Sequence, residues 1–375
     1  MPESSSSPSD LTCPDCGRTY DAGPDEPWRC ACGHPLDFAD SPTPDGPAPD
    51  FGELDARAGL WAFEDFLPVS PRVTLGEGFT PLQTPDADDW GRNVQFKLEY
   101  VFPSGSFKDR GATATLSRAA ELGVEKIVED SSGNAGAAIA QYAARAGIDA
   151  DIYVPADAKQ SKIAAIERVG ATPVRVEGSR QDVTDACVEA VESDERAGWY
   201  ASHAWNPAFF AGTATFAFEV AAQRDWAVPD AVVTPLGHGT LFLGAYRGFR
   251  ALKEAGWTDR IPRLLGAQAA GYAPIAAELH GSEDGRTNDV ADGIQILDPA
   301  RKGQILDAIE KTGGDAIALD AEPVADALDR LRRGGFYVEP TSAVAPAALA
   351  EFRERGVLDA EDEVVVPLTG SGLKS

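Results

Sequence analysis

The stretch Pro103-Ser-Gly-Ser-Phe-Lys-Asp-Arg-Gly111 decides how the rest of this sequence is interpreted. Its Gly and Ser residues predict a loop, and the small and apolar residues after them predict a helix over 106–122. Lys108 would then lie at the start of a helix, where the positive end of the helix dipole disfavours the charged form of its amine. An amine that is kept partly neutral can act as a nucleophile. The alternative is a solvent-facing lysine in an ordinary helix start.

Apolar runs typical of strands alternate with helical stretches along most of the chain. The expected strands are 94–98, 126–129, 150–154, 172–176, 231–234, 263–267, 317–319, 337–339 and 363–368. The expected helices, besides 106–122, are 134–146, 159–169, 182–193, 207–224, 240–255, 324–333 and 343–355. This alternation predicts an α/β fold with mostly parallel sheets, in which ligands bind at the carboxyl ends of the strands.

Composition and charge limit the classes of partner. The chain has 375 residues, enough for two domains, and 43% of them are hydrophobic. Its 60 acidic and 33 basic residues give a net charge of −27, which repels nucleic acid and anionic membranes, so we expect neither as a partner. The same charge argues against a nucleic-acid-binding zinc module. The acidic residues are scattered, as on the surfaces of halophile proteins. Residues 1–10 contain neither a basic region nor an apolar core, and we expect a cytoplasmic enzyme.

Two cysteine pairs, Cys13 with Cys16 and Cys30 with Cys32, occur close together near the start of the chain. Four thiolates can close a tetrahedral zinc site, and so short a module needs such a site because its apolar core is small. Disulfides are the alternative, disfavoured in a reducing cytosol, and iron is the alternative metal. Since four protein ligands leave no open position, we expect a structural metal. Residues 41–50, rich in Pro, Asp and Gly, are typical of a linker.

Three further loops follow predicted strands. Residues 131–136 read Ser-Ser-Gly-Asn-Ala-Gly, where Asn134 is a candidate helix N-cap. Residues 234–240 read Thr-Pro-Leu-Gly-His-Gly-Thr, a turn whose backbone amides can bind an anion at a helix start. Residues 368–374 read Leu-Thr-Gly-Ser-Gly-Leu-Lys and follow the last predicted strand. Each loop could alternatively be structural: a helix-capping turn in the first two cases and a frayed terminus in the third.

The lysine motif and these loops closely resemble those of the pyridoxal-phosphate enzymes of the threonine synthase, threonine dehydratase and cysteine synthase group. The resemblance implies fold type II, with a smaller α/β domain inserted into a larger one and pyridoxal 5'-phosphate in the cleft. It implies that Lys108 forms the Schiff base with the cofactor and shuttles protons of an amino-acid substrate. The implied ranges are a zinc-ribbon-like module at 10–38, a linker at 39–50, a large domain at 51–104 and 206–375, and a small domain at 105–205.

The same resemblance assigns the other site residues. It implies that Asn134 contacts the cofactor ring, that Thr369 faces the pyridine nitrogen, and that Ser131, Ser132 and Asn206 bind the substrate. The loop implied to bind the cofactor phosphate contains Gly237, His238, Gly239 and Thr240.

The last loop resembles the threonine synthase C-terminal signature, and the zinc-ribbon-like start is similar to that of archaeal-type threonine synthases. The implied reaction converts O-phosphohomoserine and water to threonine and phosphate. Members of the family are usually homodimers, so we expect a homodimer here as well.

One segment departs from the family pattern. The family stretch typically reads Asn-Pro-x-Arg-x-Glu-Gly-x-Lys-Thr, but here Phe209, Ala211 and Ala214 replace its arginine, glutamate and lysine. A phosphate that loses such charged partners must find others. The candidate replacement cations are Lys159, Lys162 and Arg110.

The other possibility is a substrate without phosphate. The motif ending Gly111-Ala112, where typical threonine synthases have methionine, is similar to that of dehydratases. The alternative function is therefore a serine/threonine dehydratase, or a β-replacement enzyme that resembles cysteine or cysteate synthase.

Overall fold

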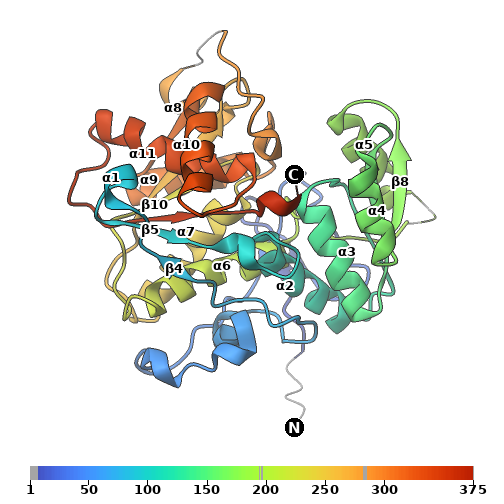
Figure 1. Ribbon diagram of the computed structural model, residues 1–375. Helices are drawn as coiled ribbons and strands as arrows, with labels where there is room; N and C mark the ends of the chain where they lie inside the picture. Colours follow the sequence, from blue (N-terminus) through green and yellow to red (C-terminus); the bar gives the residue numbers. More distant parts are fainter. Residues whose placement is uncertain (1–6, 194, 196, 282–284, 375) are drawn as a thin grey trace. The chain divides into compact units, whose positions relative to one another are not determined.

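The computed structural model describes residues 7–193, 195, 197–281 and 285–374 (Figure 1). Most of the N-terminal stretch 1–10 discussed above therefore lies outside the described residues. The chain forms two compact units. Unit 1 contains the N-terminal segment up to Pro44 together with Phe63–Gly76 and Lys108–Gly212, and unit 2 contains Asp45–Ala62, Glu77–Phe107 and the segment from Thr213 onward.

Unit 2 is built on a six-stranded sheet in the order β12-β11-β10-β13-β5-β4. Five of the strands are parallel to their neighbours, and only β4 runs antiparallel, against β5. The bounds are β4 Leu82–Gln83, β5 Val94–Lys97, β10 Ala231–Pro235, β11 Arg263–Ala269, β12 Asp315–Leu319 and β13 Val364–Pro367. Because β10, β13 and β5 are adjacent and parallel, the segments that follow them meet at one edge of this sheet.

Helices of unit 2 cover the sheet. Their bounds are α1 Ala87–Trp90, α7 Thr240–Glu254, α8 Pro274–His280, α9 Lys302–Thr312, α10 Ala321–Arg333 and α11 Val344–Glu354. Helices α10 and α11 pack on one face, where Leu331 and Phe352 join strand residues such as Phe96 in a large buried core (Figure 1). The 3-10 turns of the chain are η1 Phe51–Glu53, η2 Ala56–Phe66, η3 Glu99–Val101, η4 Asp292–Ile294, η5 Pro340–Ala343 and η6 Gly372–Lys374.

Unit 1 is built on a four-stranded parallel sheet in the order β8-β7-β6-β9. Its strands are β6 Lys126–Glu129, β7 Asp149–Pro155, β8 Thr172–Val176 and β9 Trp199–Tyr200. The helices are α2 Lys108–Glu121, α3 Asn134–Ala146, α4 Gln160–Arg168 and α5 Arg180–Glu192, and α6 Pro207–Ala222 begins in this unit and continues in unit 2. Consecutive strand residues face opposite sides: Ile127 packs with α2 and α3, whereas Val128 packs with α5, beside the buried Cys187.

A small antiparallel sheet near the N-terminus also belongs to unit 1. Its strands are β1 Leu11–Thr12, β2 Thr19–Tyr20 and β3 Asp37–Phe38, in the order β2-β1-β3. Leu11, Leu36 and two cysteines form its buried core. So few buried side chains provide little apolar stabilisation, as expected for a module that depends on a metal.

Most of the expected elements are present. The strands predicted over 126–129 and 172–176 and the helix predicted over 134–146 match β6, β8 and α3 residue for residue. The helix predicted over 106–122 begins two residues later, so that Lys108 is its first residue.

The strand predicted over 337–339 is wrong, and two helices are missed. Val338 makes only an isolated bridge with Ser371, because Pro340, which cannot donate a ladder hydrogen bond, begins η5 directly afterwards. Helices α8 and α9 are absent from the sequence-based prediction. For α9 a signal exists, since buried Ile305, Ala308 and Ile309 have helical spacing, but Gly303 weakens the first turn. Among the described helices, none combines the length and apolar character that crossing a membrane requires.

A buried ion pair lies within unit 2. Lys97 Nζ is 2.8 Å from Glu219 Oε2, and both side chains are completely buried. The same amine donates to Thr80 O at 2.6 Å and to Gln223 Oε1 at 2.8 Å. Removing one partner of such a pair leaves the other charge buried and uncompensated, which is much more costly than losing an exposed pair.

We predict that Lys97→Met lowers the free energy of unfolding by about 3–5 kcal/mol, because Glu219 then lacks its counter-charge. Urea unfolding followed by circular dichroism measures the change. Arg333→Met is the matched control: its pair with Asp329 is exposed, with side chains 80% and 63% accessible, and should change stability by less than about 1 kcal/mol. Equal unfolding midpoints for Lys97→Met and the wild type would contradict the prediction.

Candidate active site

Lys108 is the first residue of α2, and its amine lies against an aromatic ring. The Lys108 Nζ atom is 5.6 Å from the centroid of the Phe209 ring. Phe209 is completely buried and packs so closely on α2 that a Cβ at position 111 would lie 2.3 Å from its ring atoms. Only glycine at position 111 permits this approach. The residue that replaces the family's arginine therefore fills space beside the lysine with apolar surface.

The loop that follows β6 contains three predicted site residues. Ser131 is buried, and its Oγ accepts a hydrogen bond from the Gly133 amide at 3.2 Å. The prediction that Asn134 is the N-cap of the helix is wrong: Gly133 is the N-cap, and Asn134 is the first helical residue. Because Gly133 has no capping side chain, the first amides of α3 are not satisfied by a cap from this residue. Ser131, Ser132 and Asn134 lie together on this one loop and helix start.

A buried pair at the same strand end was not predicted. Glu129 is the last residue of β6, and its Oε1 lies 2.7 Å from His203 Nδ1. Burial raises the pKa of Glu129 well above its usual range; the adjacent Asp130 carboxylate raises it further, whereas the charge of Lys108 lowers it. The ring of His203 also contacts Phe209, with centroids 6.0 Å apart. The signal available in the sequence was the position of Glu129 at the carboxyl end of a strand.

Asn206 has a structural contact that the sequence did not predict. Its Oδ1 accepts a hydrogen bond from the Ala208 amide at 2.9 Å, in the first turn of α6. It also lines a cavity of about 310 Å³ together with Trp28 and with Lys126 at the amino end of β6. Ser131 and Ser132, by contrast, follow the carboxyl end of β6. The substrate-binding role of Asn206 stays a prediction.

The glycine-rich turn of unit 2 connects β10 to α7. Gly239 is the N-cap of α7, has φ +76°, and provides no side-chain cap, so Thr240 is the first helical residue. A Cβ on Gly239 would meet Ile305 at 2.6 Å, so both its conformation and its surroundings require glycine. Gly237 and Thr240 are buried, and His238 is partly exposed. The turn thus presents backbone amides at a helix start, the arrangement that binds phosphate groups.

Thr369 follows β13, the neighbour of β10, and hydrogen bonds fix it in place. Its Oγ1 lies 3.0 Å from Ser342 Oγ, which also accepts from the Gly370 amide at 2.8 Å. The Thr369 carbonyl accepts from the Phe107 amide at 3.0 Å, and Ser106 forms an isolated bridge with Gly370. Ser342 is a partner of Thr369 that sequence reasoning missed, because it lies 27 residues away and carries no motif of its own.

Each unit therefore gathers its own set of predicted residues. In unit 1, Lys108 begins α2 and residues 131–134 lie at the end of β6 and the start of α3. In unit 2, the turn 237–240 and Thr369 follow the adjacent parallel strands β10 and β13, and the loop before Lys108 follows β5, the next strand.

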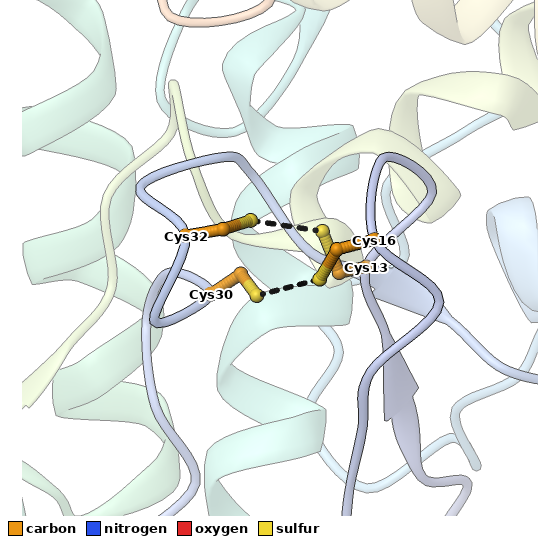
Figure 2. Close-up of side chains that lie close together, drawn as sticks. All are labelled: Cys13, Cys16, Cys30 and Cys32. Atoms are coloured by element: carbon orange, nitrogen blue, oxygen red, sulfur yellow. Dashed lines mark hydrogen bonds between the residues drawn. The ribbon is translucent and has the colours of Figure 1, made fainter.

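The four N-terminal cysteines converge on one point (Figure 2). Cys13 Sγ is 3.6 Å from Cys32 Sγ, and Cys16 Sγ is 3.5 Å from Cys30 Sγ, so no disulfide joins them. A tetrahedral zinc ion with bonds of about 2.3 Å would space its sulfur ligands by about 3.8 Å, close to these values. The Cys32 amide and then the Tyr20 hydroxyl lower the pKa of the Cys30 thiol to about 6. His34 Nδ1 lies 3.4 Å from Cys32 Sγ, outside the four-sulfur cluster.

Comparison with known proteins supports the chemistry of these residues. A family model described as "Pyridoxal-phosphate dependent enzyme" matches residues 73–370. The chain is 33% identical to the threonine synthase of Methanocaldococcus jannaschii, over 96% of this chain and 92% of that protein. It is 36% identical to the threonine synthase of Methanosarcina acetivorans, over 84% of this chain and 80% of that protein.

Solved structures share the fold. A bacterial-type match, the threonine deaminase of T.th., superimposes with a TM-score of 0.66 at 25% identity, covering 86% of this chain and 98% of that one. The L-serine ammonia-lyase of Rhizomucor miehei gives a TM-score of 0.65 at 25% identity, covering 78% and 93%. The α/β fold is thus that of the type II pyridoxal-phosphate enzymes, as the sequence predicts. With its motifs, its fold and most of its length matched in this way, the chain belongs to the pyridoxal-phosphate-dependent enzyme family.

Proposed function

We propose that this protein is a pyridoxal-phosphate-dependent lyase, a threonine synthase that converts O-phosphohomoserine and water to threonine and phosphate. The observation that carries the proposal is the identity of 33–36% to threonine synthases over 84–96% of the chain. The C-terminal signature at 368–374 supports it, because Thr369 offers the cofactor ring a neutral hydroxyl. When bound, pyridoxal phosphate withdraws electrons from the substrate and so stabilises negative charge next to its α-carbon.

The residues of unit 1 suit the reacting end of the substrate. Lys108 would hold the cofactor covalently and, once displaced by the substrate amine, move protons at the α- and β-carbons. Its contact with the buried Phe209 ring keeps water from that side of the amine. Ser131 and Ser132, with the amides at the start of α3, would bind the substrate carboxylate, and Asn134 would contact the cofactor ring.

The residues of unit 2 suit the cofactor itself. The turn containing Gly237, His238, Gly239 and Thr240 has room for an anion only because side chains are absent: a Cβ on Gly237 would already lie 3.2 Å from Ile294. Amides at the start of α7 would therefore bind the cofactor phosphate without a basic side chain. The Thr369 hydroxyl, oriented by Ser342, would face the pyridine nitrogen.

A specific observation also favours a second function. Phe209 is completely buried where the family has a phosphate-binding arginine, and Arg110, one alternative cation, is itself fully buried in α2. Lys159 is exposed at the N-cap of α4, and Lys162 is partly buried. An apolar residue beside Lys108 fits a substrate without phosphate, so the second candidate is a serine/threonine dehydratase or a β-replacement enzyme resembling cysteine or cysteate synthase.

We predict that the purified enzyme, offered O-phosphohomoserine, threonine, serine and O-phosphoserine separately, releases threonine and phosphate in equal amounts from the first. The expectation follows from its relatives and from the Thr369 signature. Amino-acid chromatography and a phosphate assay measure the products, and cofactor-free protein is the control. Formation of 2-oxobutyrate from threonine, with no phosphate released from O-phosphohomoserine, would establish the dehydratase instead.

We further propose that Cys13, Cys16, Cys30 and Cys32 bind a structural zinc ion, as in archaeal-type threonine synthases with an N-terminal zinc ribbon. The spacing of the four sulfur atoms supports this proposal, and so does the match to the M. jannaschii protein, which extends into the cysteine module. Arg118 of α2, buried in unit 1, bonds Glu26 Oε2 at 2.6 Å and so joins the module to this unit. The zinc would therefore stabilise unit 1 without taking part in the reaction.

We predict that Cys16→Ser lowers the metal content by one zinc per chain and lowers the melting temperature. Metal analysis and thermal unfolding measure the two effects, and Cys187→Ser, which changes a buried thiol outside the cluster, should keep the zinc. Chelation should reduce stability while the molecules that stay folded keep their turnover rate. An immediate loss of turnover with the fold intact would contradict a structural role.

Other features complete the proposal. We propose the division into a module at 10–38, a linker at 39–50, a large domain at 51–104 and 206–375, and a small domain at 105–205. We also propose a cytoplasmic homodimer adapted to high salt that acts on a small amino-acid substrate and binds neither nucleic acid nor membranes. The net charge of −27 supports the adaptation to salt and the absence of nucleic-acid and membrane binding.

A further inference from the structure

Two neighbouring strands of unit 1 bring three potential metal ligands together. Glu129 ends β6 and Asp130 follows it, while His203 lies three residues after the end of β9. Strands β6 and β9 are parallel neighbours, and the Ala201 amide continues their pairing by donating to Val128 O at 2.9 Å. One ligand atom from each of Glu129, Asp130 and His203 lies within 4.8 Å of the other two. The cluster is separate from the four cysteines.

Half of the carboxylate oxygens in this cluster have no donor. His203 Nδ1 pairs with Glu129 Oε1 at 2.7 Å, and Thr184 Oγ1 donates to Asp130 Oδ2 at 2.6 Å. The other two oxygens, Glu129 Oε2 and Asp130 Oδ1, are buried and accept no hydrogen bond within the described part of the chain. A buried acceptor without a partner costs about 1–3 kcal/mol, and more when it is charged. Two adjacent carboxylates in this state also repel each other.

A third buried polar group lies beside the same two carboxylates. The Tyr200 hydroxyl interacts electrostatically with both of them and has no hydrogen-bond partner among the described residues, although Tyr200 is only 3% exposed. Lys108 and Arg180 are close enough for their charges to act on Glu129, but neither donates to its Oε2. Long-range attraction therefore leaves the hydrogen-bonding capacity of these oxygens unused. A cation in direct contact with them would use it.

We propose that Glu129, Asp130 and His203 form a binding site for a divalent transition-metal ion such as Mn²⁺. An imidazole nitrogen with two carboxylate oxygens suits such an ion, whereas the four thiolates prefer zinc. Bonds of about 2.1 Å allow ligand atoms to lie up to about 4.2 Å apart, so small side-chain rotations complete the site. The ion would hold the end of β6, immediately before Ser131 and Ser132, and so order the loop proposed to bind the substrate carboxylate. The competing explanation is a proton shared by the two carboxylates.

The test measures metal binding and needs no turnover. Holoenzyme is first stripped of metal and given one equivalent of zinc, which fills the cysteine cluster. Mn²⁺ is then titrated in about 1 M KCl, which screens weak binding to surface carboxylates, and free Mn²⁺ is followed by electron paramagnetic resonance. The variants are Glu129→Gln and Asp130→Asn. Glu189→Gln, which makes the same charge change at an exposed position of α5, is the matched control.

We expect one Mn²⁺ per chain in the wild type and in Glu189→Gln. Binding should weaken more than about tenfold in Glu129→Gln and in Asp130→Asn, since even an outer-shell partner is worth that much. Pulsed resonance spectra of the wild type should show coupling of Mn²⁺ to a ¹⁴N nucleus, which does not depend on whether a variant folds. Equal Mn²⁺ binding in all four proteins, or a wild-type spectrum without nitrogen coupling, would overturn the proposal in favour of the shared proton.

Discussion

Backbone pairing between the loop before Lys108 and the end of β13 organises the candidate active site. The Phe107 amide donates to Thr369 O at 3.0 Å, and Ser106 forms a bridge with Gly370. Lys108 is covalently bonded to Phe107, so this pairing anchors the residue from which α2 begins. Strands β5, β13 and β10 are adjacent and parallel, and they direct this loop, Thr369 and the glycine-rich turn to one edge of the sheet in unit 2. The order of strands, rather than any single motif, gathers these segments.

The departure from the family pattern is a packing change as well as a loss of charge. Phe209 is completely buried, lies against Gly111, and belongs to the same apolar cluster as Ala112. The small residues at 111 and 112, where typical threonine synthases have methionine after the glycine, leave the volume that the phenyl ring fills. The two differences noted in the sequence are thus physically coupled. Together they place an apolar surface beside the lysine, and this surface is the reason to weigh a phosphate-free substrate.

Local features were predictable from the sequence, and distant pairings were not. The helix starts at Lys108 and Thr240 and the cysteine cluster could be predicted because glycine turns, helix periodicity and paired thiols act over a few residues. The Glu129–His203 pair could not, because it depends on β6 and β9 becoming neighbours across 74 residues of sequence. The predicted strand at 337–339 failed for a local reason, since Pro340 prevents a ladder there. The N-cap at Asn134 failed because Gly133 already occupies that position.

The attachment of the cofactor to one amine tests the central claim most directly. Holoenzyme is reduced with borohydride, digested, and mapped by mass spectrometry, with Lys108→Ala protein treated in parallel. The pyridoxyl label should occur on the peptide containing Lys108 at one per chain, and it should be absent from the variant. A label distributed over exposed lysines such as Lys253, or carried equally by the variant, would contradict the assignment of Lys108 as the cofactor-binding residue.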